Sequence, residues 1–253
     1  MDSYCTLEYS NQLATLEFGS AAHNALPSQV LEQMTNHLIQ IKQRPDVKTV
    51  LIKSQGERSF CAGADLNELM NLQDEKQAKN FFFRFARVIM AMRSCPQIVI
   101  ARVQGKAVGG ALGLIAAADL AFATDQASIR LSELSNGIGP FVVGPAIERK
   151  TGLSSFNHLA LNPASWFAAS WAMEHGLFNE VFHITEAMDE RIAAKIDELQ
   201  KYSGEAMREL KKMMWSDTPE WNDLMEKRSA ISGTLVMTKE SKDAIGRLVQ
   251  TGK

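Results

Sequence analysis

The sequence has few cysteines, no excess of either charge and no metal-ligand spacing. Its three cysteines, Cys5, Cys61 and Cys95, are an odd number, typical of a reducing compartment rather than of a disulfide framework. No two cysteines or histidines lie two to four residues apart, which argues against a zinc site. A net charge of −2 gives no general basis for binding nucleic acid. We therefore expect neither a metal nor a nucleic-acid partner.

Long apolar runs are also missing. The longest candidate, residues 98–122, is interrupted by Arg102, Lys106 and several glycines, so no uninterrupted apolar run approaches the ~20 residues that a membrane helix needs. The first residues, Met1–Cys5, carry no basic region followed by an apolar stretch, as a secretory signal would. With 45% hydrophobic and 22% charged residues, the composition predicts a globular cytoplasmic protein without a membrane partner.

Short apolar segments closed by turn residues alternate with segments of helical spacing in the first half of the chain. The expected strands are 13–18, 50–52, 98–103 and 118–123, and the expected helices between them are 26–41 and 80–92. The later segments 165–175, 187–202, 204–214, 220–231 and 239–249 all have helical spacing. The alternation predicts an α/β core of parallel strands, followed by a C-terminal helical region. The basic residues Arg208, Lys211 and Lys212 are interpreted as solvated positions on one of these helices.

Two loops place glycine between a buried strand and a helix. They are residues 59–66, which contain Gly63, and residues 105–111, which contain Gly109 and Gly110. Glycine lets a ligand approach the backbone, and a helix that follows aims its first N–H groups at that ligand. Two such N–H groups converging on one oxygen would form an oxyanion hole.

Known glycine-rich motifs that bind nucleotides or carry a serine nucleophile do not fit these loops. Their glycines lack the G-x-G-x-x-G spacing of a dinucleotide site, no Gly-Lys-Ser or Gly-Lys-Thr of a P-loop is present, and the chain has no G-x-S-x-G nucleophile elbow. Taken singly, each loop is best interpreted as a tight strand-to-helix turn. The two loops together, about 45 residues apart, favour a shared site.

The glycine loops belong to a series of segments in a fixed order. The series is His23–Leu26, Phe60–Leu66, Val103–Gly110, Ala118–Leu120, Ser132–Leu134 with Gly137–Pro140, and Ala169–Val181. This series resembles the enoyl-CoA hydratase/isomerase family, also called the crotonase superfamily, across most of the chain. The resemblance implies a crotonase-like repeated ββα core with an acyl-CoA site in residues 1–190. It also implies a C-terminal helical trimerisation region in residues 191–253, and a homotrimer or hexamer.

The resemblance also assigns roles at the site. The backbone N–H groups of Ala64 and Gly110 would bind the thioester carbonyl of an acyl-CoA and stabilise the enolate formed from it. Coenzyme A would enter as part of the substrate, with no separate cofactor. The residues expected to contact the substrate are Asn24, Ala25, Leu26, Ala62, Gly63, Asp65, Leu66, Gly109, Pro140 and Phe141. Further candidates for the acyl pocket are Leu69, Met70 and residues 81–85, which are equally explained as core.

The acids of the site depart from the family pattern. Family hydratases carry two glutamates, of which the second matches Glu133, while the first falls at Gly113, where no carboxylate is possible. Two carboxylates favour the addition of water, whereas moving a double bond needs one base that removes a proton and returns it to another carbon. The residues therefore favour isomerisation of an enoyl-CoA, with Glu133 as the single base.

Several alternatives stay open. Hydration of a short-chain or branched substrate such as methylglutaconyl-CoA remains possible with Glu133 alone, as do decarboxylation and thioester hydrolysis on the same scaffold. A binding protein that kept the CoA site and lost catalysis is a rival from another class, although the retained Glu133 argues against it. RNA binding, known for one branch of the family, is disfavoured by the acidic balance.

Overall fold

The computed structural model describes residues 3–251 of the chain. Residues 1–2 and 252–253 lie outside the described residues. The expectation that the first five residues carry no secretory signal falls partly on residues 1–2. No helix in the described range is long and apolar enough to cross a membrane.

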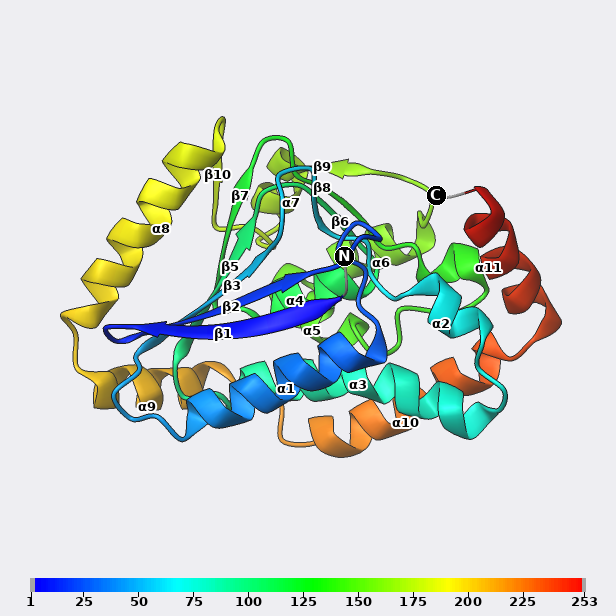
Figure 1. Ribbon diagram of the computed structural model, residues 1–253, viewed down its shortest axis with the longest axis horizontal. Coiled ribbons are helices and arrows are strands. Elements are labelled where there is room, and N and C mark those ends of the chain that lie inside the picture. The colour runs from blue at the N-terminus through cyan, green and yellow to red at the C-terminus, as the bar shows by residue number, and fades with distance from the viewer. Residues whose placement is uncertain (1–2, 252–253) are drawn as a thin grey trace.

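The larger of two sheets has six strands in the order β1-β2-β3-β5-β7-β10 (Figure 1). Its strands are β1 (Tyr4–Ser10), β2 (Leu13–Gly19), β3 (Thr49–Ser54), β5 (Ile98–Val103), β7 (Leu120–Thr124) and β10 (Glu180–Phe182). β1 and β2 form an antiparallel hairpin, and all other neighbours are parallel. Every residue of β5 is buried, because β5 lies at the centre of the sheet between two layers of helices.

The smaller sheet has four short strands in the order β4-β6-β8-β9. They are β4 (Ser59–Cys61), β6 (Lys106–Val108), β8 (Ser128–Arg130) and β9 (Phe167–Ala168). β4, β6 and β8 are parallel to one another, and β9 closes the edge in antiparallel pairing with β8.

Each of three successive units contributes one strand to the large sheet, then one strand to the small sheet, and then a helix. β3 and β4 lead to α2 (Leu66–Met70) and α3 (Glu75–Ser94), β5 and β6 lead to α4 (Gly110–Ala117), and β7 and β8 lead to the 3-10 turn η1 (Glu133–Asn136). The expected α/β class with repeated ββα units is confirmed. The predicted strand at residues 98–103 has the observed bounds, and the other predicted strands lie within a few residues of β2, β3 and β7.

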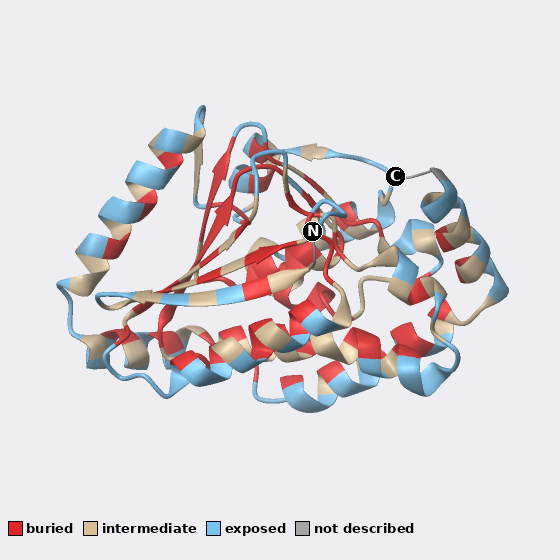
Figure 2. Ribbon diagram, in the orientation of Figure 1, coloured by how far each residue is buried: buried red, intermediate tan, exposed pale blue. Residues whose placement is uncertain are grey.

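Helices cover the large sheet on both faces (Figure 1). α1 (Ser28–Lys42) and α3 pack on one side with α10 (Trp221–Val236) beyond them, and α8 (Thr185–Gln200) crosses the other side. Figure 2 shows α8 as a mostly exposed helix with a narrow buried stripe, in contrast to the buried strands. The remaining helices are α5 (Gly144–Thr151), α6 (Leu153–Leu161), α7 (Ala169–Glu174), α9 (Gly204–Met214) and α11 (Lys239–Thr251).

The predicted helix at 165–175 is wrong at its start. Phe167 pairs with Ile129 to form β9, and helix α7 begins only at Ala169. β10 was not predicted, because a strand of three residues owes its conformation to pairing with β7 rather than to its own pattern. The interpretation of Lys211 as solvated is also wrong. Its side chain is 2% exposed, and its Nζ lies 2.8 Å from Asp119 Oδ2.

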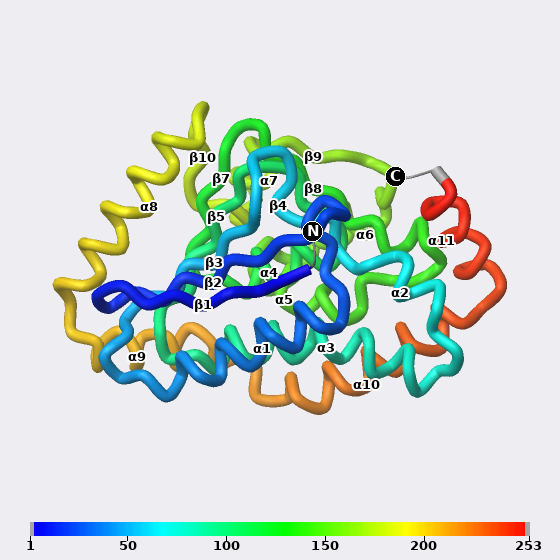
Figure 3. Tube along the Cα trace, viewed as in Figure 1, coloured from blue at the N-terminus to red at the C-terminus, as the bar shows by residue number. Residues whose placement is uncertain are grey.

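The C-terminal helices α10 and α11 pack against the earlier helices α3 and α2. The tube in Figure 3 shows α10 running beside α3. The first part of α11 contacts the end of α2, where Lys242 Nζ donates to the carbonyl oxygens of Leu69 and Met70. Trp221, Met225, Val236 and Ile245 from these helices belong to the main hydrophobic core. The expected boundary after residue 190 falls within α8. Whether residues 191–253 mediate trimer formation stays a prediction.

Candidate active site

Three segments of the predicted site meet because the small sheet is parallel. Its strands β4, β6 and β8 run side by side, so their carboxyl ends lie at one edge. The segments that leave this edge carry Ala64, Gly110 and Glu133. A hydrogen bond of 2.8 Å from the Gly109 N–H to the Arg130 carbonyl ties the second loop to the end of β8.

In the first loop, the N–H of Ala64 points away from the neighbouring segment that contains Leu26. Leu26 forms a parallel bridge with Ala64, in which the Leu26 N–H donates to Gly63 O at 2.8 Å and Leu26 O accepts from the Asp65 N–H at 3.4 Å. Because Leu26 bonds to the residues on either side of Ala64, the N–H of Ala64 itself points to the opposite side. Gly63 has a φ of +88°, and a Cβ there would lie 2.7 Å from Val108 O.

The second loop supplies the other N–H. Gly109 has a φ of +54°, which a side chain would strain, and Gly110 is the first residue of α4. The N–H of a first helical residue has no acceptor within its helix, and it lies at the positive end of the helix dipole. A Cβ at Gly63 would be 3.6 Å from Gly110 N, so the two loops are in contact. This arrangement supports the predicted oxyanion hole.

Glu133 brings a carboxyl group to the same place. A Cβ at Gly109 would lie 3.1 Å from Glu133 Oε1, so the acid is beside the second loop. The residue is only partly exposed, and its Oε2 is buried without a hydrogen-bond partner among the described residues. Burial away from water raises the pKa of this carboxyl to about 7. A carboxyl that exchanges its proton near neutral pH is suited to act as a general base.

Gly113 leaves no room for the missing acid. A Cβ at this position would lie 2.6 Å from Val143 Cγ1 and 3.1 Å from Ile89 Cδ1. The space that a second glutamate would need is therefore filled by apolar side chains, and the lack of a carboxylate is built into the packing.

A cavity of about 70 Å³ opens between these segments. Nine of the predicted site residues line it, namely Ala62, Gly63, Ala64, Leu66, Gly109, Gly110, Glu133, Pro140 and Phe141. Of the further acyl-pocket candidates, Leu69, Phe82 and Phe85 also line it. Glu133 is the one carboxylate on its wall within residues 3–251.

The other four predicted residues lie behind the cavity wall and position it. Asn24 is 5% exposed, and its Nδ2 donates to Gln55 O at 2.7 Å and to Ser59 O at 2.9 Å. Leu26 is fully buried beside Ala64, and Ala25 precedes it. Asp65 caps helix α2 by accepting from the Glu68 N–H.

Besides Ser132, which directly precedes Glu133, two polar residues of the cavity wall were not predicted. Asn136 stands three residues after Glu133 on η1, and Ser232 comes from α10. The spacing from Glu133 could have indicated Asn136. No local signal indicates Ser232, because α10 reaches the site only through the tertiary fold.

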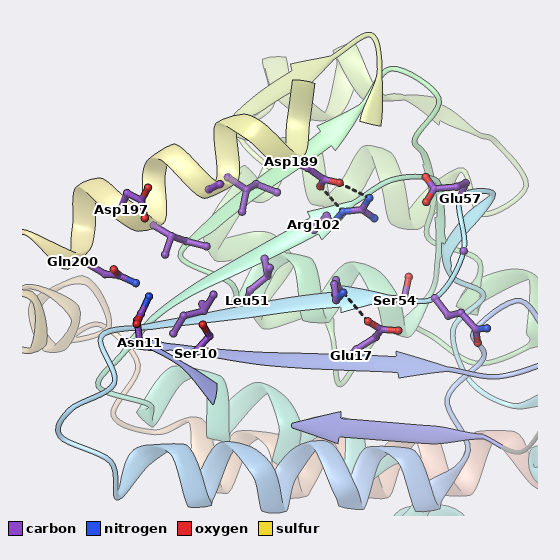
Figure 4. Close-up of a pocket in the computed structure, with 17 residues that line it drawn as sticks. Ser10, Asn11, Glu17, Leu51, Ser54, Glu57, Arg102, Asp189, Asp197 and Gln200 are labelled. Atoms are coloured by element: carbon purple, nitrogen blue, oxygen red, sulfur yellow. Dashed lines mark hydrogen bonds and ion pairs between the residues drawn. The ribbon is translucent and has the colours of Figure 1, made fainter. Parts of the chain in front are cut away.

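A larger cavity of about 490 Å³ lies between the large sheet and α8 (Figure 4). Its charged side chains include two ion pairs, Glu17–Lys53 at 2.7 Å and Arg102–Asp189 at 2.6 Å. Because these charges are neutralised within the protein and no predicted site residue lines this cavity, we place the candidate site at the loops.

Within residues 3–251 no group of three or more His, Cys, Asp or Glu side chains is arranged to hold a metal ion. The expectation that the protein needs no separate cofactor stays a prediction.

Comparison with known proteins places these features in context. A sequence model of the enoyl-CoA hydratase/isomerase family matches residues 8–248. The protein YngF of Bacillus subtilis, whose name refers to enoyl-CoA hydratase/isomerase, is 34% identical over 128 residues, 51% of this chain and 48% of that protein. The match thus spans about half the length of this relative. A peroxisomal Delta(3,5)-Delta(2,4)-dienoyl-CoA isomerase of Arabidopsis thaliana is 28% identical over 210 residues, 75% of this chain and 74% of that protein.

Solved structures share the fold. The crystal structure of an enoyl-CoA hydratase from Bacillus halodurans superposes with a TM-score of 0.88. The superposition covers 97% of this chain and all of that one, at 18% sequence identity.

Proposed function

The chain belongs to the enoyl-CoA hydratase/isomerase family, and we propose that it is an enzyme that moves the double bond of an enoyl-CoA with Glu133 as the single base. The thioester oxygen would accept hydrogen bonds from the N–H groups of Ala64 and Gly110. Both donors belong to the backbone of loops held by packing, so they are in place before the substrate arrives.

The reaction needs one proton carrier. Ionised Glu133 removes a proton from C2 of a 3-enoyl thioester, and the electron pair of that C–H bond forms the enolate. The two N–H groups stabilise the negative oxygen. The enolate then collapses as Glu133 returns the proton to C4, which leaves the double bond between C2 and C3. No atom is gained or lost.

One observation supports this reaction most strongly. Oε2 of Glu133, on a residue that lines the cavity, is buried without a hydrogen-bond partner among the described residues, whereas position 113 is a glycine packed against Val143. A base with a pKa near 7 is half ionised at neutral pH, so it can both take and return a proton.

The test is a product panel with the purified protein. We would incubate 3-enoyl-, 2-enoyl- and methylglutaconyl-CoA and separate products by mass and retention time. A shift in retention time without a mass change from the 3-enoyl thioester is the expected result. No product from any of these, despite measurable binding of the CoA ester, would overturn the proposal in favour of a binder or of another acyl-CoA reaction.

We also propose self-association as a trimer or hexamer. Three large apolar side chains of the C-terminal region are well exposed, Leu210 at 48%, Met213 at 64% and Ile231 at 45%. Apolar exposure of this kind is typical of surfaces that bind another chain. Analytical ultracentrifugation would decide, and a monomer at micromolar concentration would contradict the proposal.

A further inference from the structure

One wall of the candidate cavity carries a hydroxyl group that the protein itself does not pair. Ser232, from α10, lines the cavity and is 1% exposed. Its Oγ forms no hydrogen bond with another residue of the described range 3–251. In contrast to Glu133 Oε2 and Asn136 Oδ1, this atom is not fully enclosed. Because buried polar groups are nearly always paired, an accessible and unpaired hydroxyl on a cavity wall indicates a partner that arrives with the ligand.

Another serine of the same helix shows the usual arrangement. Oγ of Ser229 donates to Met225 O at 2.7 Å, one turn earlier, and the residue is fully buried. Ser232 makes no such bond within the described part of the chain. A small residue is needed where α10 meets α3, since a Cβ at Gly233 would lie 2.7 Å from Lys79 N. Alanine would meet that need and is the better helix former, so close packing alone does not explain the hydroxyl.

Helix α3 sets the distance between this hydroxyl and the oxyanion hole. At one end of the cavity Phe85 packs on the second glycine loop, because a Cβ at Gly110 would collide with the Phe85 ring. At the other end α10 contacts α3 at Lys79, the neighbour of Gly233. A helix rises 1.5 Å per residue, so the levels of residues 79 and 85 are about 9 Å apart. Phe82 lines the cavity between them.

The size of the cavity fits a short acyl group. Its volume of about 70 Å³, at about 10–15 Å³ for each water-sized group, holds about five to seven non-hydrogen atoms. The distance along α3 agrees with the volume. A hydrogen bond of about 2.8 Å to Ser232 Oγ leaves about 6 Å for the acyl chain, and an extended chain advances about 3.5 Å for every three bonds. An atom that meets Ser232 is therefore about five bonds from the thioester carbon.

The charge of the cavity wall decides which polar group fits there. Within residues 3–251 no Lys or Arg side chain lines the cavity, and its one charged group is Glu133. A carboxylate at the far end of the acyl chain would be buried without a cation and near a second carboxylate, which costs free energy. A neutral oxygen carries no such cost. The serine hydroxyl can donate to a carbonyl or hydroxyl oxygen, and it can accept from a hydroxyl.

We propose that Ser232 is a specificity-determining residue, which selects a short enoyl group that carries a neutral oxygen, hydroxyl or carbonyl, about five bonds from the thioester carbon. The inference rests on the proposed function, because it places the acyl group of the same thioester in the same cavity. The oxyanion hole fixes one end of the chain and Ser232 fixes the other, so the carbons between them are held beside Glu133.

Two thioesters of matched shape test this selection. 5-Hydroxy-3-pentenoyl-CoA places a hydroxyl five bonds from the thioester carbon, and 3-hexenoyl-CoA has a methyl group in its place. Double-bond migration would be measured with the wild type, Ser232→Ala and Ser229→Ala, which removes a buried hydroxyl of the same helix outside the cavity wall. We expect the wild type to favour the hydroxylated thioester by about fivefold or more in kcat/KM. Ser232→Ala should lower this kcat/KM about 5- to 30-fold and change that of 3-hexenoyl-CoA by less than about threefold, whereas Ser229→Ala should leave the ratio unchanged.

Binding of saturated analogues separates the selection of the acyl group from the chemistry. Calorimetry with 5-hydroxypentanoyl-CoA and hexanoyl-CoA should show tighter binding of the hydroxylated analogue by the wild type and no difference for Ser232→Ala. If this difference is seen but no enoyl thioester is isomerised, the proposed function fails and the selection by Ser232 stands. If 3-hexenoyl-CoA is isomerised but the hydroxyl gives no preference in either measurement, the proposed function stands and the inference fails.

The remaining outcomes contradict the proposal. An unchanged preference in Ser232→Ala would show that its hydroxyl does not meet the substrate, and an equal loss in Ser229→Ala would show a structural effect of α10. Faster turnover of glutaconyl-CoA, whose acyl chain ends in a carboxylate, would overturn the neutral oxygen. Faster turnover of 3-decenoyl-CoA would overturn the short chain.

Discussion

Asp119 and Glu133 each have a buried carboxylate oxygen, and the surroundings of the two oxygens are opposite. Asp119, before β7, is 6% exposed and receives hydrogen bonds from the Val99 N–H at 2.7 Å and from Lys211 Nζ at 2.8 Å. Glu133, after β8, has a buried Oε2 that receives none from the described residues. The first carboxylate fastens α9 to the large sheet, and the second faces the cavity between the glycine loops.

The difference distinguishes a carboxylate with a structural role from one suited to catalysis. A buried charge that is fully paired holds its neighbours in place but is not free to exchange a proton with a ligand. A buried acid without a partner costs stability, and in return it has a pKa near neutrality. Substitutions at the two sites should therefore differ in kind, affecting stability at Asp119 and catalysis at Glu133.

The largest effect is expected from Glu133→Gln. The amide has nearly the same shape but cannot take a proton, so kcat for isomerisation should fall by about 100- to 10,000-fold. Binding of a saturated acyl-CoA, measured by calorimetry, should change little because the backbone donors remain. Glu174→Gln, at an exposed position on α7, is the matched control. Full activity in Glu133→Gln would rule out the single-base reaction.

The next largest effect is expected from Lys211→Met. This change leaves Asp119 buried without its cation, and breaking a buried pair typically costs about 3–5 kcal/mol. The free energy of unfolding, measured in urea, should fall by that amount, while kcat per folded molecule stays the same. The double variant Lys211→Met/Asp119→Asn should recover part of the loss. A change below about 1 kcal/mol in the single variant would contradict the structural role.

The sequence predicts one of these two sites far better than the other. The loops of Gly63 and Gly109 are visible because backbone chemistry requires glycine at fixed points next to strands, and Glu133 is visible through its match to the family's series of segments. The pair of Lys211 and Asp119 is not visible, because the two residues lie on distant segments and Lys211 sits in an ordinary basic cluster on a helix. Its burial follows from how α9 packs on β5 and on the start of β7.

The same reasoning explains the other differences. Helices with strong periodicity, such as α9, were predicted with their observed bounds, since the pattern itself carries the signal. β9 and β10 have two and three residues and exist only through pairing with β8 and β7. Ser232 reaches the cavity because α10 returns along α3, which no local pattern records.

A third effect should appear in the pH dependence of isomerisation. Glu133 must be ionised to remove a proton, and burial raises its pKa to about 7. Activity in kcat/KM should therefore rise with pH and level off above about 7, and it should fall about tenfold for each pH unit below that value. An activity that stays constant down to about pH 5 would show that the acting base is not this buried carboxyl.

The smallest expected effect is a change in stability at pH 8 that has opposite signs for substitutions of Glu133 and Asp119. In the folded protein Glu133 has a pKa of about 7, above its ordinary value of 4.5, so the folded state binds this proton more tightly than the unfolded state. Its ionisation therefore removes stability as the pH rises from about 4.5 to 7. Glu133→Gln cannot ionise, and at pH 8 it should be more stable than the wild type by about 1–2 kcal/mol, a value below the full linkage because the residue is partly exposed. The difference should vanish below about pH 4.5.

The corresponding change Asp119→Asn should destabilise the protein at pH 8, since it weakens the hydrogen bonds to Lys211 and to the Val99 N–H. Thermal unfolding of both variants at pH 8 and pH 4.5 measures this contrast, and the same sign at both sites would show that Glu133 is held by partners as Asp119 is.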